Sequence, residues 1–140
     1  MAENPIRHPF SHPVIKRFIE NIEKAIASSS IVLSSNIQKH FIPDGRAVYL
    51  KGSLVFVDSS ILEIAMFVSE TRDAVKVEKY RLHYIKSNGQ MLFRYDNAPH
   101  HPEITSYPHH KHTPDNIIPS AEPSLKDVMK EISATMIGKP

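Results

Sequence analysis

The chain has 140 residues, 41% hydrophobic and 23% charged, which fits one globular domain over residues 1–140 and excludes wholesale disorder. Its formal net charge of +2 permits a polyanionic partner but does not demand one. The absence of cysteine excludes disulfides and thiolate metal sites. Without an apolar signal core or a run of membrane-spanning length, the sequence predicts a soluble cytoplasmic protein with no membrane partner.

The first part of the chain predicts an irregular arm followed by one helix. Pro5 and Pro9 favour an irregular arm over residues 1–12, whereas Pro13 suits the first turn of a helix. From Val14 to Ile26, apolar residues recur at three-and-four spacing with charged residues on the other side. This pattern predicts an amphipathic helix with one buried stripe.

Five β-rich runs follow, separated by turn signals such as Pro43-Asp44-Gly45. The predicted strands are Ile31 to Phe41, Ala47 to Val57, Ile61 to Val68, Val75 to Ile85, and Met91 to Asp96. The third is almost wholly apolar, which predicts a strand covered on both faces. Gly52, inside the second, marks a bulge or a close approach of another backbone.

Asn88-Gly89, between the last two runs, is a strong hairpin signal. A two-residue loop would place Ser87 opposite Gln90. The same register pairs Arg81 with Asp96, Leu82 with Tyr95, His83 with Arg94, and Tyr84 with Phe93. Alternation then puts the four apolar and aromatic members on the core face, and the polar members Arg81, His83, Arg94 and Asp96 on the other.

Residues 94–123 form a region rich in proline and histidine, which predicts a stiff, extended loop. Five of the nine histidines lie between His100 and His112. A last helix is predicted from Leu125 to about Ile132 or beyond, with Ser124 and Asp127 forming a capping box. The expected fold is α+β, a single antiparallel sheet of about five strands with an N-terminal and a C-terminal helix packed against it.

Two blocks carry a resemblance to a known family: Arg94-Tyr-Asp-Asn-Ala-Pro-His-His-Pro-Glu103 and Pro108-His-His-Lys-His112. Together with the hairpin before them and the stretch Tyr49 to Asp58, they resemble the TumE family, small prokaryotic toxins of toxin–antitoxin pairs. The resemblance covers about Arg46 to Ile132. It implies a toxin-like role and a small antitoxin protein as partner.

The chain departs from the family pattern at two positions. Ser59 stands where family members often carry glycine, and Met66 lies near the place where many carry an acidic residue.

The residues allow RNA cleavage, because histidine titrates near neutrality and arginine has a fixed fork of donors for phosphate. The candidate catalytic residues are His83, Arg94, His100, His101, His109, His110 and His112. The candidate substrate-binding residues are Arg81, Asp96, Tyr107 and Lys111. The first hypothesis is therefore a toxin that acts on RNA as a small ribonuclease without a cofactor.

Two alternatives to the metal-free ribonuclease stay open. A homodimeric state also stays open. The first is a metal-dependent hydrolase that uses a divalent ion. On an extended chain His109 and His110 point to opposite faces, whereas His110 and His112 point the same way and suit one ion. The second is a non-catalytic binding module in which the histidines only stiffen the loop.

Overall fold

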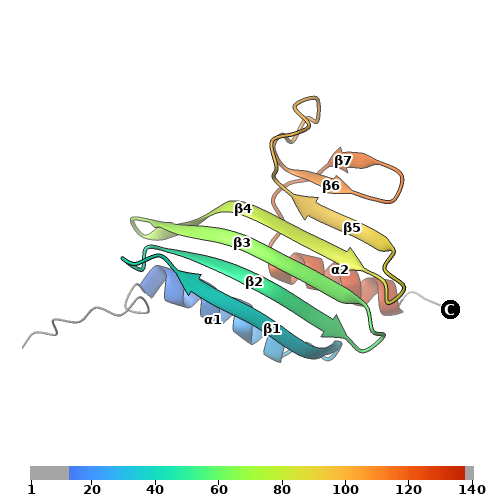
Figure 1. The fold of residues 1–140 in the computed structure, drawn as a ribbon, viewed down its shortest axis with the longest axis horizontal. Coiled ribbons are helices and arrows are strands. Elements are labelled where there is room, and N and C mark those ends of the chain that lie inside the picture. Colours follow the sequence, from blue (N-terminus) through green and yellow to red (C-terminus); the bar gives the residue numbers. More distant parts are fainter. Residues whose placement is uncertain (1–12, 138–140) are drawn as a thin grey trace, which may run out of the picture.

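The computed structural model describes residues 13–137, so the predicted arm over residues 1–12 lies outside the described part of the chain. Within residues 13–137 the elements are α1 (Pro13–Ala27), β1 (Val32–Phe41), β2 (Ala47–Phe56), β3 (Ile61–Thr71), β4 (Ala74–Ile85), β5 (Met91–Asp96), β6 (His110–His112), β7 (Ile117–Pro119) and α2 (Leu125–Ile137). All seven strands form one antiparallel sheet in chain order. The predicted α+β fold is confirmed, with two more strands than expected (Figure 1).

Both helices lie on the same side of the sheet and leave its other face free of helix (Figure 1). The apolar stripe of α1 buries Ile15 and Ile19, and α2 buries Val128 and Ile132. These side chains share one core with alternate residues of the central strands: Leu50, Leu54, Phe56, Leu62, Ile64, Leu82, Tyr84 and Phe93. Since strand side chains alternate, the intervening residues must point to the helix-free face.

The two additional strands lie in the region of residues 94–123 that was predicted to be a loop throughout. β6 adds to the edge of the β4–β5 hairpin, and β7 pairs with β6. Each has only three residues, which is too short for a periodic signal. Pro119 ends β7 at the edge of the sheet, where its missing N–H costs no ladder bond.

The predicted register of the β4–β5 hairpin is confirmed, although its loop differs. Arg81, Leu82, His83 and Tyr84 pair with the expected partners on β5. The loop has three residues, so that Lys86 and not Ser87 stands opposite Gln90, and the Lys86 N–H donates to the Gln90 carbonyl at 2.9 Å. A register shift between Tyr84 and Ile85 compensates for the extra loop residue.

One local prediction is confirmed, and the structure places the two positions that depart from the family pattern. At the start of α2, the Asp127 N–H donates to Ser124 Oγ at 3.0 Å, and the Ser124 N–H donates to Asp127 Oδ2 at 3.2 Å, as the capping box predicts. Ser59 has a φ of 72°, a left-handed conformation that favours glycine. Met66 is buried in the core.

No helix within residues 13–137 is both long and apolar enough to cross a membrane.

Gly52 marks a close backbone approach, since the β1–β2 register runs past it without a shift. A Cβ placed on Gly52 would lie 1.8 Å from the Asn36 carbonyl oxygen and 2.7 Å from the Ile37 Cα. Real atoms cannot approach so closely, so any side chain at this position must push β1 away from β2.

We therefore expect Gly52→Ala to lower the free energy of unfolding by about 1–3 kcal/mol, as overpacking of a filled site does. Denaturant unfolding of the purified protein measures the change. Ser53→Ala, at the next position of the same strand, is the matched control and should stay within about 0.5 kcal/mol of the wild type. A Gly52→Ala protein as stable as the Ser53→Ala protein would contradict the close approach.

Candidate functional site

Polar side chains gather on the helix-free face where β3, β4, β5 and β6 lie side by side. Register places them in two cross-strand rows: Glu63, His83, Arg94 and His112 in the first, and Arg81, Asp96 and His110 in the second, which begins with the apolar Ala65. Residues two apart on a strand share a face, so each strand contributes one member to each row. The two rows bring residues far apart in the sequence into one surface.

Asp96 is the centre of this surface, with only 4% of the residue exposed. Its Oδ1 accepts the Ala98 N–H at 3.0 Å and lies 2.9 Å from His110 Nε2. Its Oδ2 accepts Arg94 Nε–H at 3.0 Å and lies 3.4 Å from His112 Nε2. A buried carboxylate is tolerated only when it is paired and hydrogen-bonded, and these contacts meet that requirement.

His110 is held on both sides of its ring and is only 2% exposed. Its Nδ1 lies 2.9 Å from the Pro108 carbonyl oxygen, which can only accept, so Nδ1 carries a hydrogen and donates it. This contact turns Nε2 toward Asp96. The ring orientation is therefore fixed by the backbone of the loop and by the carboxylate.

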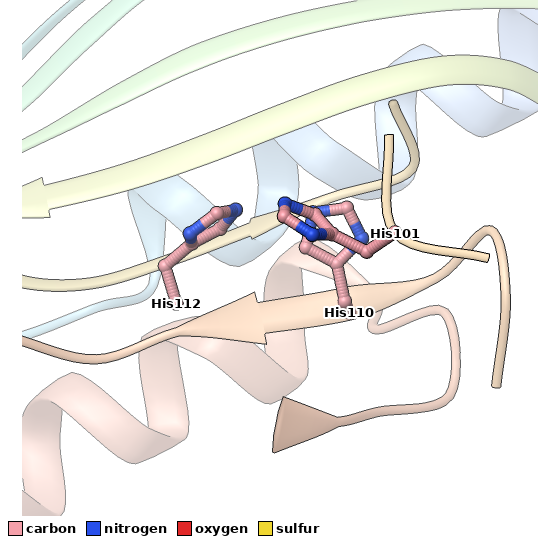
Figure 2. A group of neighbouring side chains, drawn as sticks. All are labelled: His101, His110 and His112. Carbon is pink, nitrogen blue, oxygen red and sulfur yellow. The ribbon is translucent and has the colours of Figure 1, made fainter. Parts of the chain in front are cut away.

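His112 and His101 complete a cluster of three imidazoles with His110 (Figure 2). His112 Nε2 accepts a hydrogen bond from Arg94 Nη2 at 3.0 Å. Burial, reinforced by the positive charge of Arg94, lowers the pKa of His112. The His101 ring comes from the β5–β6 loop, with its centroid 5.2 Å from that of His110 and 5.8 Å from that of His112. One ring nitrogen from each residue lies within 4.8 Å of the others.

The imidazole cluster lines a cleft of about 450 Å³ on the helix-free face. Three cationic side chains, Lys79, Arg81 and Arg94, share this lining. Tyr49 and Phe67 lie in the same lining as an edge-to-face pair with ring centroids 6.4 Å apart, and Tyr49 is 43% exposed. The cleft thus combines imidazole, positive charge and accessible aromatic surface.

The chain can be assigned to a family by its match to a known family model. The family model described as Toxin TumE matches residues 22–136, which include every strand, the imidazole cluster and nearly all of α2. The chain belongs to the TumE toxin family. No curated protein and no solved structure matches it.

Most of the site residues predicted for this TumE-family chain come together. Those lining the cleft are Arg81, Arg94, Asp96, His100, His101, His110 and His112. His83 lies beside them, with its Nδ1 3.1 Å from Arg81 Nη2 and 3.3 Å from Glu63 Oε1. Burial and the positive charge of Arg81 lower the pKa of His83, so this ring is a neutral neighbour of the cleft.

Three of the residues predicted to belong to the site lie outside the cleft. His109 stacks on Tyr80 with its Nδ1 2.9 Å from the Tyr80 hydroxyl, and it does not line the cleft. Lys111 contacts Glu131 of α2 at 2.7 Å, on the helix side of the sheet. Tyr107 is exposed outside the cleft lining. The position of Lys111 follows from alternation along β6: His110 and His112 point to the helix-free face, and Lys111 between them points to the helix side.

Sequence reasoning missed Tyr49, Phe67 and Lys79. The run Ile61 to Val68 was predicted to be covered on both faces, and this is wrong, because Ala65 and Phe67 are only partly buried on the helix-free face. An apolar run hides which of its residues face water. Extending the hairpin register from β4 to β3 would have revealed them, since Phe67 pairs with Lys79 and Ala65 with Arg81.

The contacts of Asp96 generate a stability prediction. Asp96→Ala removes the partner of two buried or half-buried histidines and of Arg94, so we expect the free energy of unfolding to fall by about 3 kcal/mol. Asp73→Ala, in the exposed β3–β4 turn, is the control and should change it by less than about 0.5 kcal/mol. Equal stability of the two variants, measured by denaturant unfolding, would show that Asp96 does not hold the site together.

Proposed function

We propose that this TumE-family protein is a toxin that cleaves RNA at the helix-free face of its sheet. One observation carries the proposal: three imidazoles converge with Arg94 and Asp96 on a cleft that also presents Lys79 and Arg81. Cleavage of a phosphodiester needs groups that move protons or activate oxygen, and it needs cations that stabilise the charged phosphorane. The cleft offers both.

The reaction proposed is attack by a ribose 2′-oxygen on the adjacent phosphorus. The 2′-hydroxyl loses its proton as the new P–O2′ bond forms, the P–O5′ bond breaks, and the departing 5′-oxygen takes up a proton. The products are a 2′,3′-cyclic phosphate and a 5′-hydroxyl, so the step needs no oxidant or reductant. Imidazole supports it either by transferring the protons itself or by holding a metal ion that activates an oxygen.

Arg94 is suited to hold the phosphate in this reaction. Asp96 fixes its Nε, so the guanidinium keeps further N–H donors on its terminal nitrogens. Its side chain is about a third exposed and lines the cleft, where it meets solvent and substrate. A guanidinium held in place before substrate arrives stabilises developing charge at little reorganisation cost.

The proposed substrate is single-stranded RNA. Lys79 and Arg81 add positive charge along the cleft for the backbone, while Tyr49 and Phe67 present aromatic surface for an unstacked base. Proteins that read single strands combine these two features. A base in a duplex is stacked on its neighbours and could not use such aromatic contacts.

The competing function is a binding module without catalysis. Hydrogen bonds between the loop backbone and the clustered side chains favour it. The Pro108 carbonyl and the Ala98 N–H engage His110 and Asp96, so part of the cluster serves loop architecture. Arg94 distinguishes the two functions, because its hydrogen bonds go to the side chains of Asp96 and His112 and its guanidinium lines the cleft.

Family membership also leads us to propose a small antitoxin protein as partner, encoded beside the toxin gene. Expression of the chain alone should arrest growth, and co-expression with the neighbouring gene should restore it. Growth counts after induction measure both outcomes. Harmless expression of the soluble chain on its own would count against toxicity and against the pairing.

The ribonuclease proposal predicts the effect of removing Arg94. We expect Arg94→Ala to reduce RNA cleavage by about a hundredfold or more and to relieve growth arrest, because the phosphorane loses a positioned cation. Arg17→Ala is the matched control, since Arg17 is exposed on α1, behind the sheet, and should leave cleavage unchanged. Circular dichroism checks that both variants stay folded. Full cleavage by a folded Arg94→Ala protein would show that Arg94 does not hold the phosphate, whereas absence of cleavage by the folded wild type would favour the non-catalytic module.

A further inference from the structure

We propose that His101, His110 and His112 bind one divalent transition-metal ion, with Zn²⁺ as the best-matched species, and leave a coordination position open to the cleft. Imidazole nitrogen is a preferred ligand of Zn²⁺, and a site of three protein ligands with a free position is typical of catalytic zinc. What the ion would do rests on the proposed function, in which it activates an oxygen for phosphodiester cleavage. That it binds is argued from the ligand residues alone.

His110 has the hydrogen-bonding pattern of a metal ligand. Its Nδ1–H donates to the Pro108 carbonyl at 2.9 Å, so Nε2 is the ring atom that can coordinate an ion, in exchange for any proton it carries. Metal-bound histidines usually donate their other ring N–H to a backbone carbonyl or carboxylate in this way. The ring is almost fully buried, so its orientation is set before an ion arrives.

The Nε2 atom of His110 faces a carboxylate. Asp96 Oδ1 lies 2.9 Å away, and two electron-rich atoms at this distance repel each other unless a positive species accompanies them. A proton on Nε2 would satisfy the pair, and so would a metal ion beside both atoms. The second solution also explains why two further imidazoles converge on the same place.

The spacing of the three rings is close to what one ion needs. Ligands on a tetrahedral Zn²⁺ with bonds of about 2.0–2.1 Å lie about 3.3 Å apart. The three ring nitrogens lie within 4.8 Å of one another, so a shift of about 1 Å per ligand closes the site. His101 is the ring that can move most easily, because it comes from the β5–β6 loop and is partly exposed, whereas His110 and His112 are fixed on β6 (Figure 2).

Asp96 supports the ion by its charge. Its two oxygens lie 2.9 and 3.4 Å from the Nε2 atoms of His110 and His112, so a cation between these rings would sit beside a buried negative group. Its other contacts, with the Ala98 N–H and Arg94 Nε, keep the carboxylate in place. A carboxylate oxygen is itself a common ligand type of Zn²⁺, so its position beside the coordinating nitrogens favours the cation.

Arg94 competes with the ion for His112. Its Nη2 donates to the His112 Nε2 at 3.0 Å, so metal binding at that nitrogen requires the guanidinium to release it. The released group would still be held to Asp96 through Nε and would turn its terminal nitrogens toward the cleft. Metal binding and phosphate binding are thereby compatible, and removal of Arg94 should strengthen the metal site.

Calorimetric titration of the full-length, chelator-treated protein with Zn²⁺ tests the proposal. We expect one Zn²⁺ per chain with a Kd below about 1 µM. His101→Ala, His110→Ala and His112→Ala should each weaken binding by about a hundredfold or more, and Arg94→Ala should bind at least as tightly as the wild type. His109→Ala is the matched control, because its ring stacks on Tyr80 away from the cluster, and it should bind as the wild type does.

The outcomes separate this proposal from the proposed function. No saturable binding at about 100 µM Zn²⁺, or equal loss in His109→Ala and His101→Ala, overturns the metal site, and chelator-resistant RNA cleavage would then leave the ribonuclease standing. Binding with the expected ligand dependence but without RNA cleavage supports the site and contradicts the ribonuclease. If His110→Ala fails to fold, His101→Ala decides, since His101 is partly exposed and its removal leaves the buried pair of His110 and Asp96 in place.

Discussion

The arrangement of the site depends on the burial of one carboxylate. Asp96 ends β5 at a point where the β5–β6 loop and β6 itself cover it, and a charge so deeply buried must be compensated by neighbouring groups. The compensation comes from three directions: Arg94 on the same strand, His110 on the next strand, and the Ala98 N–H at the start of the loop. One charge therefore fixes the strand, the loop and the cation together, and displacement of any one of them removes a partner of the buried carboxylate.

The second constraint is the alternation of side chains across a sheet with helices on one side only. Lys111 points to α2, while its neighbours His110 and His112 point to the open face. Tyr95 and Arg94 divide in the same way, since the Tyr95 hydroxyl donates to Glu131 of α2 and Arg94 lies among the imidazoles. A slip of one residue in the pairing of β5 with β6 would send the histidines into the core and the lysine into the cleft.

The parts of this design that could be predicted are those with a local signal. Asn88-Gly89 sets the β4–β5 register, and with it the position of His83 beside Arg94, even though the loop proves to be one residue longer and a bulge restores the pairing. The path from Asp96 to His110 has no such signal, because its prolines exclude helix without specifying a direction. The convergence of His101 on β6 could thus not be predicted from the sequence, whereas the shared face of His110 and His112 followed from their spacing.

Phe67 was missed for another reason. The run Ile61 to Val68 is almost wholly apolar, so composition could not distinguish its exposed side from its buried side.

Among the described residues 13–137, none from α2 lines the cleft, yet this helix supports the imidazole cluster from the other face of the sheet. Glu131 accepts the Tyr95 hydroxyl at 2.6 Å and contacts Lys111 Nζ at 2.7 Å, so one residue of α2 holds both β5 and β6. Lys111 also lies about 5 Å from the ring centroids of Phe93 and Tyr95, which adds attraction between its charge and the aromatic faces. Since β6 is only three residues long, its few ladder bonds cannot by themselves fix the direction of His110 and His112. The contacts behind the strand supply the missing rigidity, so a helix on one face of the sheet helps to position the imidazoles on the other.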